Sequence, residues 1–278
     1  MSVDGYQKLF EMGSITFNPR GTQLLKDDLS WWDTVVTGLA ELVGTAVLVF
    51  MTCMGCVGSL SSEPSGLQTA LASGFTVTCV IQTIGHISVA HINPAVTVCS
   101  VLLGLKSITT AAVYIVAQML GGVIGYGMLK VDTKSTFCVT ALNNLISPIQ
   151  GLLTETMATG ILILLCCASW DPRNGRNSDS TAIKFGLTVA TLSMAVGPYT
   201  GCSMNPARTF APALWNNEWS FHWIYWLGPI AGSTLISLGY KTLFWPKKSL
   251  KEDSPEAAAL NSVDTQKPEV CSDREMCR

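Results

Sequence analysis

The amino-acid sequence predicts an all-α membrane protein in which six transmembrane helices and two half-helices form an inverted repeat. Three observations carry this prediction. The 278 residues are 48% hydrophobic and 13% charged, with a mean hydropathy of +0.37, whereas soluble domains carry about 25% charged residues. The tripeptide Asn-Pro-Ala occurs twice inside apolar stretches, at Asn93-Pro94-Ala95 and Asn205-Pro206-Ala207. An acidic residue also recurs at matching positions of the two halves.

Six apolar segments come close to the length of about 20 residues that a membrane-spanning helix needs. They lie near 34–58, 67–87, 107–129, 150–170, 182–200 and 221–244. The fifth segment is marginal by itself and is assigned by its place in the series. The first 33 residues contain several acids and lack the apolar core of a cleavable signal peptide, so the first segment is expected to insert by itself.

Each Asn-Pro-Ala tripeptide predicts a helix that begins inside the membrane. Asparagine is a favoured N-cap, and proline at the first helical position lacks only an N–H that has no helical partner anyway. From Asn93 to Leu103 such a helix is roughly 15 Å long, which is half of a hydrocarbon core of roughly 30 Å. Two half-helices can therefore meet at the midplane with their N-termini facing each other.

The two halves carry the same unit in opposite orientations. Glu41 and Glu155 are 114 residues apart, and Asn93 and Asn205 are 112 residues apart. Three spans per half is an odd number, so the second half must be inverted in the membrane. A buried carboxylate is costly unless it is bonded. We therefore expect each glutamate to accept N–H bonds from the loop before its own half-helix, a structural role that we prefer to a catalytic one.

The basic residues predict the orientation. With six spans both termini share one side with the loops near 88–106 and 171–184, and this side carries most of the Lys and Arg residues. The opposite side has Lys130 and Lys134. The positive-inside rule therefore places both termini in the cytoplasm. The small net charge of −2 argues against nucleic acid as a partner.

Most of the ten cysteines lie within the apolar segments. Cys53 and Cys56 have the spacing of a metal or redox pair, but no second pair or nearby histidine accompanies them. We interpret both as small hydrophobic residues on an apolar helix, and we expect no metal and no cofactor. Two glycine-rich stretches, at 121–125 and 228–232, predict close helix packing.

The chain resembles the aquaporin (major intrinsic protein) family over about 31–245. The resemblance rests on the stretches Gly85 to Ala95 and Tyr199 to Arg208, each with its Asn-Pro-Ala, together with the repeated glutamates and the six spans. It implies an hourglass channel domain at 33–245, with inverted repeats at about 33–130 and 150–245. The cytoplasmic tails would be 1–32 and 246–278, the second of them disordered. It also implies a homotetramer in the cell membrane, one pore per subunit, and no enzymatic activity.

The resemblance assigns roles to the pore residues. Asn93 and Asn205 would donate side-chain hydrogen bonds to the permeant, and the positive ends of the half-helices would disfavour cations and proton relay. Backbone carbonyls would form a ladder of acceptors, on Val89, Ala90, His91, Gly201, Cys202 and Ser203. The narrow filter would consist of Ser73, Ser193, Cys202 and Arg208.

Two of these filter positions suggest what passes. Ser73 and Ser193 stand where water-selective members usually carry phenylalanine and histidine. A wider filter with two hydroxyls and the Arg208 guanidinium suits glycerol, urea and small polyols as well as water. The pattern resembles the insect entomoglyceroporins. The alternative is a water-selective channel whose missing rings are replaced by Phe75 or Tyr199; an alternating-access transporter and an adhesion protein are more distant alternatives.

Overall fold

The computed structural model describes residues 30–57, 64–130 and 137–246, and regular structure in these residues is helical throughout. The chain divides into a unit Met1–Phe244 and a unit Trp245–Arg278, and all of the helices belong to the first. The two predicted tails lie almost entirely outside the described residues, as does Lys134.

Each half has two long helices, one short helix and a third long helix, in the order that the sequence predicts. The long helices of the described chain are α2 (Trp31–Met54), α3 (Gly66–Ser88), α5 (Ile108–Lys130), α6 (Pro148–Trp170), α7 (Thr181–Thr200) and α9 (Ile224–Leu243). The short ones are α4 (Pro94–Leu103) and α8 (Pro206–Asn216), with a 3-10 helix η1 (Pro172–Ser180) between α6 and α7. Each predicted apolar segment corresponds to one long helix, so the predicted fold class is confirmed.

Apolar composition differs among the long helices. Helices α2, α3, α5 and α6 are long and apolar enough to cross a membrane by length and composition. Helices α7 and α9 have 20 residues each but are less apolar. In α9 the difference has a visible cause, because Gly228, Gly232, Ser233 and Ser237 are buried against protein rather than directed outward.

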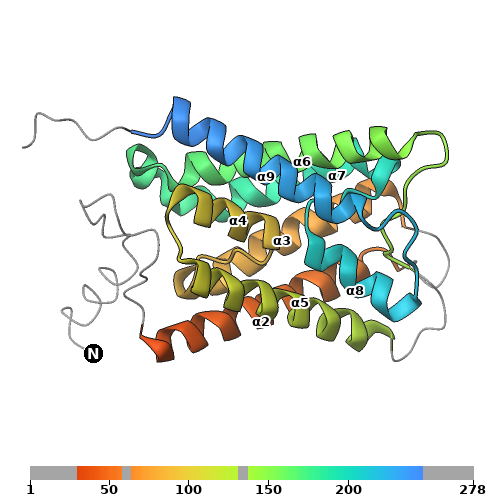
Figure 1. Ribbon diagram of the computed structural model, residues 1–278. Helices are drawn as coiled ribbons and strands as arrows, with labels where there is room; N and C mark the ends of the chain where they lie inside the picture. The colour runs from red at the N-terminus through yellow and green to blue at the C-terminus, as the bar shows by residue number, and fades with distance from the viewer. Residues whose placement is uncertain (1–29, 58–63, 131–136, 247–278) are drawn as a thin grey trace, which may run out of the picture. The chain divides into compact units, whose positions relative to one another are not determined.

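The helices pair in a way that repeats between the halves (Figure 1). Helix α2 packs along α5, and its counterpart α6 packs along α9. Helix α5 contacts α8 of the other half, and correspondingly α9 contacts α4. Helices α3 and α7 pack against each other between the halves. Figure 1 shows the half-helices α4 and α8 toward opposite ends of the bundle, as an inverted repeat requires.

Glycines allow the two main helix pairs to approach closely. A Cβ atom on Gly125 of α5 would collide with the Ala46 carbonyl of α2, and one on Gly232 of α9 would collide with the Thr156 carbonyl of α6. Small residues at such contacts let helix backbones come together in membranes. The packing predicted for both glycine-rich stretches is confirmed.

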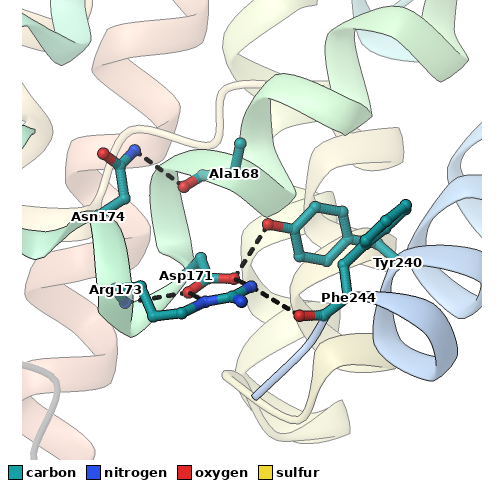
Figure 2. A network of polar contacts seen from close by, with 6 residues as sticks. All are labelled: Ala168, Asp171, Arg173, Asn174, Tyr240 and Phe244. Atoms are coloured by element: carbon teal, nitrogen blue, oxygen red, sulfur yellow. Dashed lines mark hydrogen bonds and ion pairs between the residues drawn. The ribbon is translucent and has the colours of Figure 1, made fainter.

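A polar cluster connects the turn after α6 to the last turn of α9 (Figure 2). The carboxylate of Asp171, the C-cap residue of α6, accepts from Arg173 Nε at 2.9 Å and Nη2 at 2.6 Å. It also accepts from the Tyr240 hydroxyl at 3.0 Å. Arg173 Nη2 donates further to the Phe244 carbonyl at 2.6 Å. The start of η1 is thereby attached to α9.

We expect Asp171→Asn to lower the thermal unfolding temperature at neutral pH. The Arg173 hydrogen bonds lower the pKa of the Asp171 carboxyl from 3.8 to about 2. A depressed carboxyl pKa stabilises the fold above the unfolded-state pKa, and that stabilisation is lost as the pH falls through the folded-state pKa. Unfolding of purified protein should show a wild-type advantage above about pH 5 that disappears toward about pH 2. Salt should reduce the advantage, because the Arg173 side chain is 61% exposed.

Asp179→Asn is the matched control for this prediction, because Asp179 is an exposed acid in the same 3-10 helix. It should leave the unfolding temperature unchanged at every pH. A difference between wild type and Asp171→Asn that persists undiminished at low pH would contradict the assignment of the stabilisation to the Asp171 carboxylate.

Candidate functional site

The two Asn-Pro-Ala tripeptides start the two half-helices. The Asn93 side-chain oxygen accepts from the Ala95 N–H at 2.9 Å, and the Asn205 oxygen accepts from the Ala207 N–H at 3.0 Å. Pro94 and Pro206 occupy the first positions of α4 and α8. Each asparagine thus supplies an acceptor to N–H groups that have no partner within the helix.

The same asparagines join the two halves. Asn93 Nδ2 donates to the Met204 carbonyl, and Asn205 Nδ2 donates to the Ile92 carbonyl, both at 2.8 Å. These reciprocal bonds hold the two half-helix N-termini together. A carboxamide has two N–H donors, so one N–H of each asparagine remains after these bonds. Donation to a permeant, as the sequence predicts, would use that second hydrogen.

The loops before the two half-helices have matching backbone conformations. Positive φ angles occur at Val89 (70°), Ala90 (51°) and Ile92 (44°), and again 112 residues later at 201 (77°), 202 (48°) and 204 (52°). Non-glycine residues rarely adopt such angles unless the surroundings enforce them. All six residues predicted for the carbonyl ladder line the central cavity described below.

The buried glutamates stabilise these loops. Glu41 is fully buried and accepts from the N–H groups of His91 at 2.9 Å and Ile92 at 2.6 Å. Glu155 is also fully buried and accepts from the N–H groups of Ser203 and Met204, both at 2.9 Å. Each carboxylate therefore satisfies consecutive loop N–H groups that have no helical partner.

Hydroxyl and amide side chains complete the two acceptor sites. Ser88 Oγ donates to Glu41 and Thr200 Oγ1 donates to Glu155, each at 2.6 Å. Gln118 Nε2 of α5 also donates to Glu41, at 2.8 Å. Sequence reasoning missed these three partners, although a glutamine inside the apolar segment near 107–129 was a visible signal.

His91 lies in the loop between α3 and α4, and its ring is held by contacts with other side chains. Its Nδ1 atom lies 3.2 Å from the Thr97 hydroxyl, and its ring contacts Tyr114 and Trp170. The residue is 3% exposed. These contacts keep the ring in place beside the loop carbonyls.

A cavity of about 780 Å³ runs through the bundle. Both asparagines line it, as do residues of α7 from Thr181 to Pro198. That stretch of α7 rises about 26 Å at roughly 1.5 Å per residue, close to the roughly 30 Å of a hydrocarbon core. No Asp or Glu of the described residues lines the cavity. The paired half-helix N-termini therefore make its middle electropositive.

All four predicted filter residues line this cavity: Ser73, Ser193, Cys202 and Arg208. Ser73 Oγ donates to the Thr69 carbonyl of its own helix at 2.9 Å, which leaves its lone pairs toward the cavity lining. The Ser193 hydroxyl and the Cys202 thiol line neighbouring parts of the cavity wall. The half-buried Arg208 donates from Nη1 to the Cys138 carbonyl at 3.1 Å. The structure thus places all four residues on the wall of one cavity.

The interpretation of Cys53 as a free hydrophobic residue is wrong. Cys53 forms a disulfide with Cys138, with a Cα–Cα distance of 5.2 Å. The pairing joins residues 85 positions apart, so it depends on how α2 packs and not on the Cys-x-x-Cys spacing. Cys56 is a free thiol and lines the cavity. In the described residues, no group of three or more His, Cys, Asp or Glu side chains is arranged to hold a metal ion.

We expect a mercurial reagent to inhibit permeation through Cys202. This thiol lines the cavity next to Ser193, so a bound mercury atom would obstruct the lumen. Stopped-flow measurement of vesicle shrinkage should show inhibition in the wild type and little inhibition in Cys202→Ser. Cys79→Ser, which removes an exposed thiol outside the cavity, should remain fully sensitive. Undiminished sensitivity of Cys202→Ser would show that the reactive thiol lies elsewhere, with Cys56 as the next one to replace.

The inverted helical repeat, the paired half-helices and the cavity between them define an α-helical membrane channel protein. A profile of the family described as Major intrinsic protein matches residues 28–240. Rat Aquaporin-2 is 41% identical over 220 residues, which cover 77% of this chain and 81% of the relative. The chicken lens fiber major intrinsic protein is 34% identical over 225 residues, covering 78% and 84%. The chain belongs to the major intrinsic protein family.

A solved structure supports the fold. The X-ray structure of the aquaglyceroporin from Plasmodium falciparum superposes with a TM-score of 0.64, and the match covers 76% of this chain and 96% of the other. The two sequences are 22% identical, so this likeness concerns the arrangement of the helices and not the permeant.

Proposed function

We propose that the protein is a passive channel that conducts water together with glycerol, urea and small polyols and excludes ions and protons. One observation carries the proposal: Ser73 and Ser193 line the same cavity as the two Asn-Pro-Ala asparagines and Arg208. A solute that crosses this cavity meets the Ser193 hydroxyl, which can donate and accept hydrogen bonds, the Ser73 oxygen, which can accept them, and a guanidinium, which only donates. Glycerol and urea can exchange their water hydrogen bonds for these.

Exclusion of ions follows from the charges around the cavity. The half-helix N-termini each carry roughly half a positive charge, and Arg208 adds a full one. No acidic side chain of the described residues lines the cavity, so a cation inside it would find no carboxylate to replace its hydration. An anion would have to lose most of its hydration in a lining that is largely apolar.

The water-selective alternative requires rings that replace the missing phenylalanine and histidine. Phe75 and Tyr199 were the candidates, but their side chains are 58% and 49% exposed and neither lines the cavity. Phe185 does line it, two turns of α7 and about 12 Å from Ser193. A ring at that distance does not narrow the serine-lined region, which favours the wider filter.

The subgroup, the orientation and the assembly belong to the same proposal. The named relatives do not support an assignment to the insect entomoglyceroporins, so that assignment depends on Ser73 and Ser193 alone. We place the channel domain at 33–245 in the cell membrane. The distribution of Lys and Arg supports an orientation with both termini in the cytoplasm. The exposed apolar residues of the long helices suit contact with lipid and with other subunits of a homotetramer.

Stopped-flow measurements on reconstituted vesicles test the proposal. Water, glycerol and urea should each cross faster than in protein-free vesicles, without saturation and without dependence on an ion gradient. Glycerol entry no faster than in protein-free vesicles, beside rapid water flux, would establish the water-selective alternative. Saturating, ion-dependent flux would indicate a transporter, and negligible flux of every solute would indicate an adhesion protein.

A further inference from the structure

The disulfide between Cys53 and Cys138 connects the buried face of α2 to the outer end of the cavity. Cys53 lies in the last two turns of α2, is fully buried, and packs in a core cluster with Val49, Tyr126 and Ala211. Cys138 lies in the segment 137–143, which follows α5 and is here called the outer segment. Cys138 and its neighbour Val139 line the cavity.

Cys138 is also the residue that holds the Arg208 guanidinium. Arg208 Nη1 donates to the Cys138 carbonyl at 3.1 Å, and Nη2 lies 3.5 Å from the Cys138 sulfur. Within the described residues, the hydrogen bonds of this guanidinium both end on Cys138. The same residue, Cys138, therefore carries the disulfide to α2 and orients the arginine.

The backbone of Cys138 has an unusual conformation that the disulfide can help to maintain. Its φ angle is 62°, in the left-handed region that a residue with a Cβ atom rarely adopts. Such a conformation persists only where the surroundings enforce it. The outer segment is otherwise attached by packing of the Phe137 ring against Tyr126 and by hydrogen bonds, among them one from the Asn143 N–H to the Tyr199 carbonyl at 2.9 Å. Tyr126 donates to the Phe137 carbonyl at 2.9 Å, Thr140 bonds to Thr209 at 3.0 Å, and Asn143 donates to the Pro198 carbonyl at 2.9 Å.

We propose that the Cys53–Cys138 disulfide positions Arg208 by aiming the Cys138 carbonyl, and that it thereby sets the selectivity of the outer cavity. Cys53 and Cys138 act as positioning residues, because their effect on the permeant is exerted through the Arg208 guanidinium. Without the disulfide Cys138 relaxes toward negative φ, its carbonyl turns away, and the guanidinium is free to enter the lumen. A free guanidinium hinders a large solute more than a small one. The inference rests on the proposed function only in that Arg208 contributes to the filter.

The predicted orientation fits a disulfide at this place. The outer segment lies on the side opposite to the basic loops, which the positive-inside rule assigns to the outside of the cell. Disulfides persist in that oxidising environment.

The test compares the glycerol-to-water permeability ratio per channel in reconstituted vesicles. Cys53→Ser/Cys138→Ser should lower this ratio about tenfold or more, as expected when a hydrogen bond to a charged group is lost. Cys79→Ser, which replaces a free thiol outside the cavity, should keep the wild-type ratio. Cys53→Ser/Cys138→Gly should restore much of the ratio, because glycine adopts positive φ without a covalent constraint. A purely structural role for the disulfide predicts no such recovery.

Arg208→Val completes a double-mutant cycle. If the disulfide acts through the guanidinium, removing it in the Arg208→Val background should change the ratio no further. If the double serine variant does not fold, the assembled wild-type channel can be reduced with a phosphine, which yields two thiols and the phosphine oxide. That treatment should lower the ratio in the wild type and leave it unchanged in Cys53→Ser/Cys138→Gly.

Three results would overturn the inference. They are an unchanged ratio after loss of the disulfide, an equal effect with and without Arg208, and a non-reducing peptide map that lacks the Cys53–Cys138 link. A wild type that conducts water but not glycerol would refute the proposed permeants instead. The inference would then be decided on water permeability alone, which should fall on loss of the disulfide only when Arg208 is present.

Discussion

Glycerol flux through the Ser73→Phe/Ser193→His variant should fall to the level of protein-free vesicles, while water flux persists. Both serines line the cavity on facing helices, α3 and α7, which pack against each other. Replacing two hydroxymethyl groups by rings narrows the lumen from both sides. A reduction of at least tenfold corresponds to about 1.4 kcal/mol in the barrier, which a steric obstruction exceeds easily. Water is small enough to pass and to hydrogen-bond with the new imidazole.

Cys79→Phe/Thr191→His is the matched control for the filter variant. It adds the same two rings to the same two helices, but at exposed positions outside the cavity. Its glycerol and water fluxes should equal those of the wild type. Glycerol flux that survives in the filter variant would show that the narrowest part of the channel lies elsewhere along the cavity, for instance near Phe185.

Replacing either buried glutamate by leucine should abolish the folded channel. Glu41→Leu removes the acceptor of four donors: Ser88 Oγ, the N–H groups of His91 and Ile92, and Gln118 Nε2. Each orphaned buried donor costs about 1–3 kcal/mol, so the expected loss is about 4 kcal/mol or more, against a total stability of about 5–15 kcal/mol. Glu155→Leu orphans three donors and should be somewhat less harmful. The measurements are the yield of monodisperse protein, its unfolding temperature and the water permeability.

The control for the glutamates is Glu218→Leu. Glu218 is exposed and accepts a hydrogen bond from the Ser220 N–H at 3.1 Å near the protein surface. Its replacement should change the unfolding temperature and the permeability little, because water can satisfy the released N–H. A Glu41→Leu protein that retains wild-type unfolding temperature and flux would disprove the structural role assigned to the buried carboxylates.

Much of the fold could be predicted because its signals act over short distances along the chain. The length of an apolar segment determines whether it can span a membrane, and Asn followed by Pro starts a helix through bonds to the next few residues. Glu41 and Glu155 lie beside the loops that the sequence assigned to them, because a buried carboxylate needs donors and the N–H groups of these loops have no helical partner. The close packing at the two glycine-rich stretches was also predictable, because residues without large side chains let a neighbouring helix approach closely.

The parts that sequence reasoning missed depend on contacts between distant segments. Gln118 reaches Glu41 across 77 residues, and Cys53 reaches Cys138 across 85. Spacing along the chain marks neither Gln118 as a partner of Glu41 nor Cys138 as the partner of Cys53. Any of several cysteines could pair with Cys53 until the positions of the helices are known. The polar cluster of Asp171, Arg173 and Tyr240 likewise forms only because the end of α6 meets the end of α9.

The sequence by itself determined the membrane helices, the inverted repeat, the two half-helices and the identity of the residues that meet at the middle of the bundle. Only the tertiary structure decided which side chains face the cavity: Ser73 and Ser193 line it, whereas Phe75 and Tyr199 do not. It also decided that Arg208 is held by Cys138, and that Cys138 is bound covalently to α2. The physical reason is that apolar length and capping are properties of short segments, whereas the direction of a side chain depends on the rotation of its helix against its neighbours.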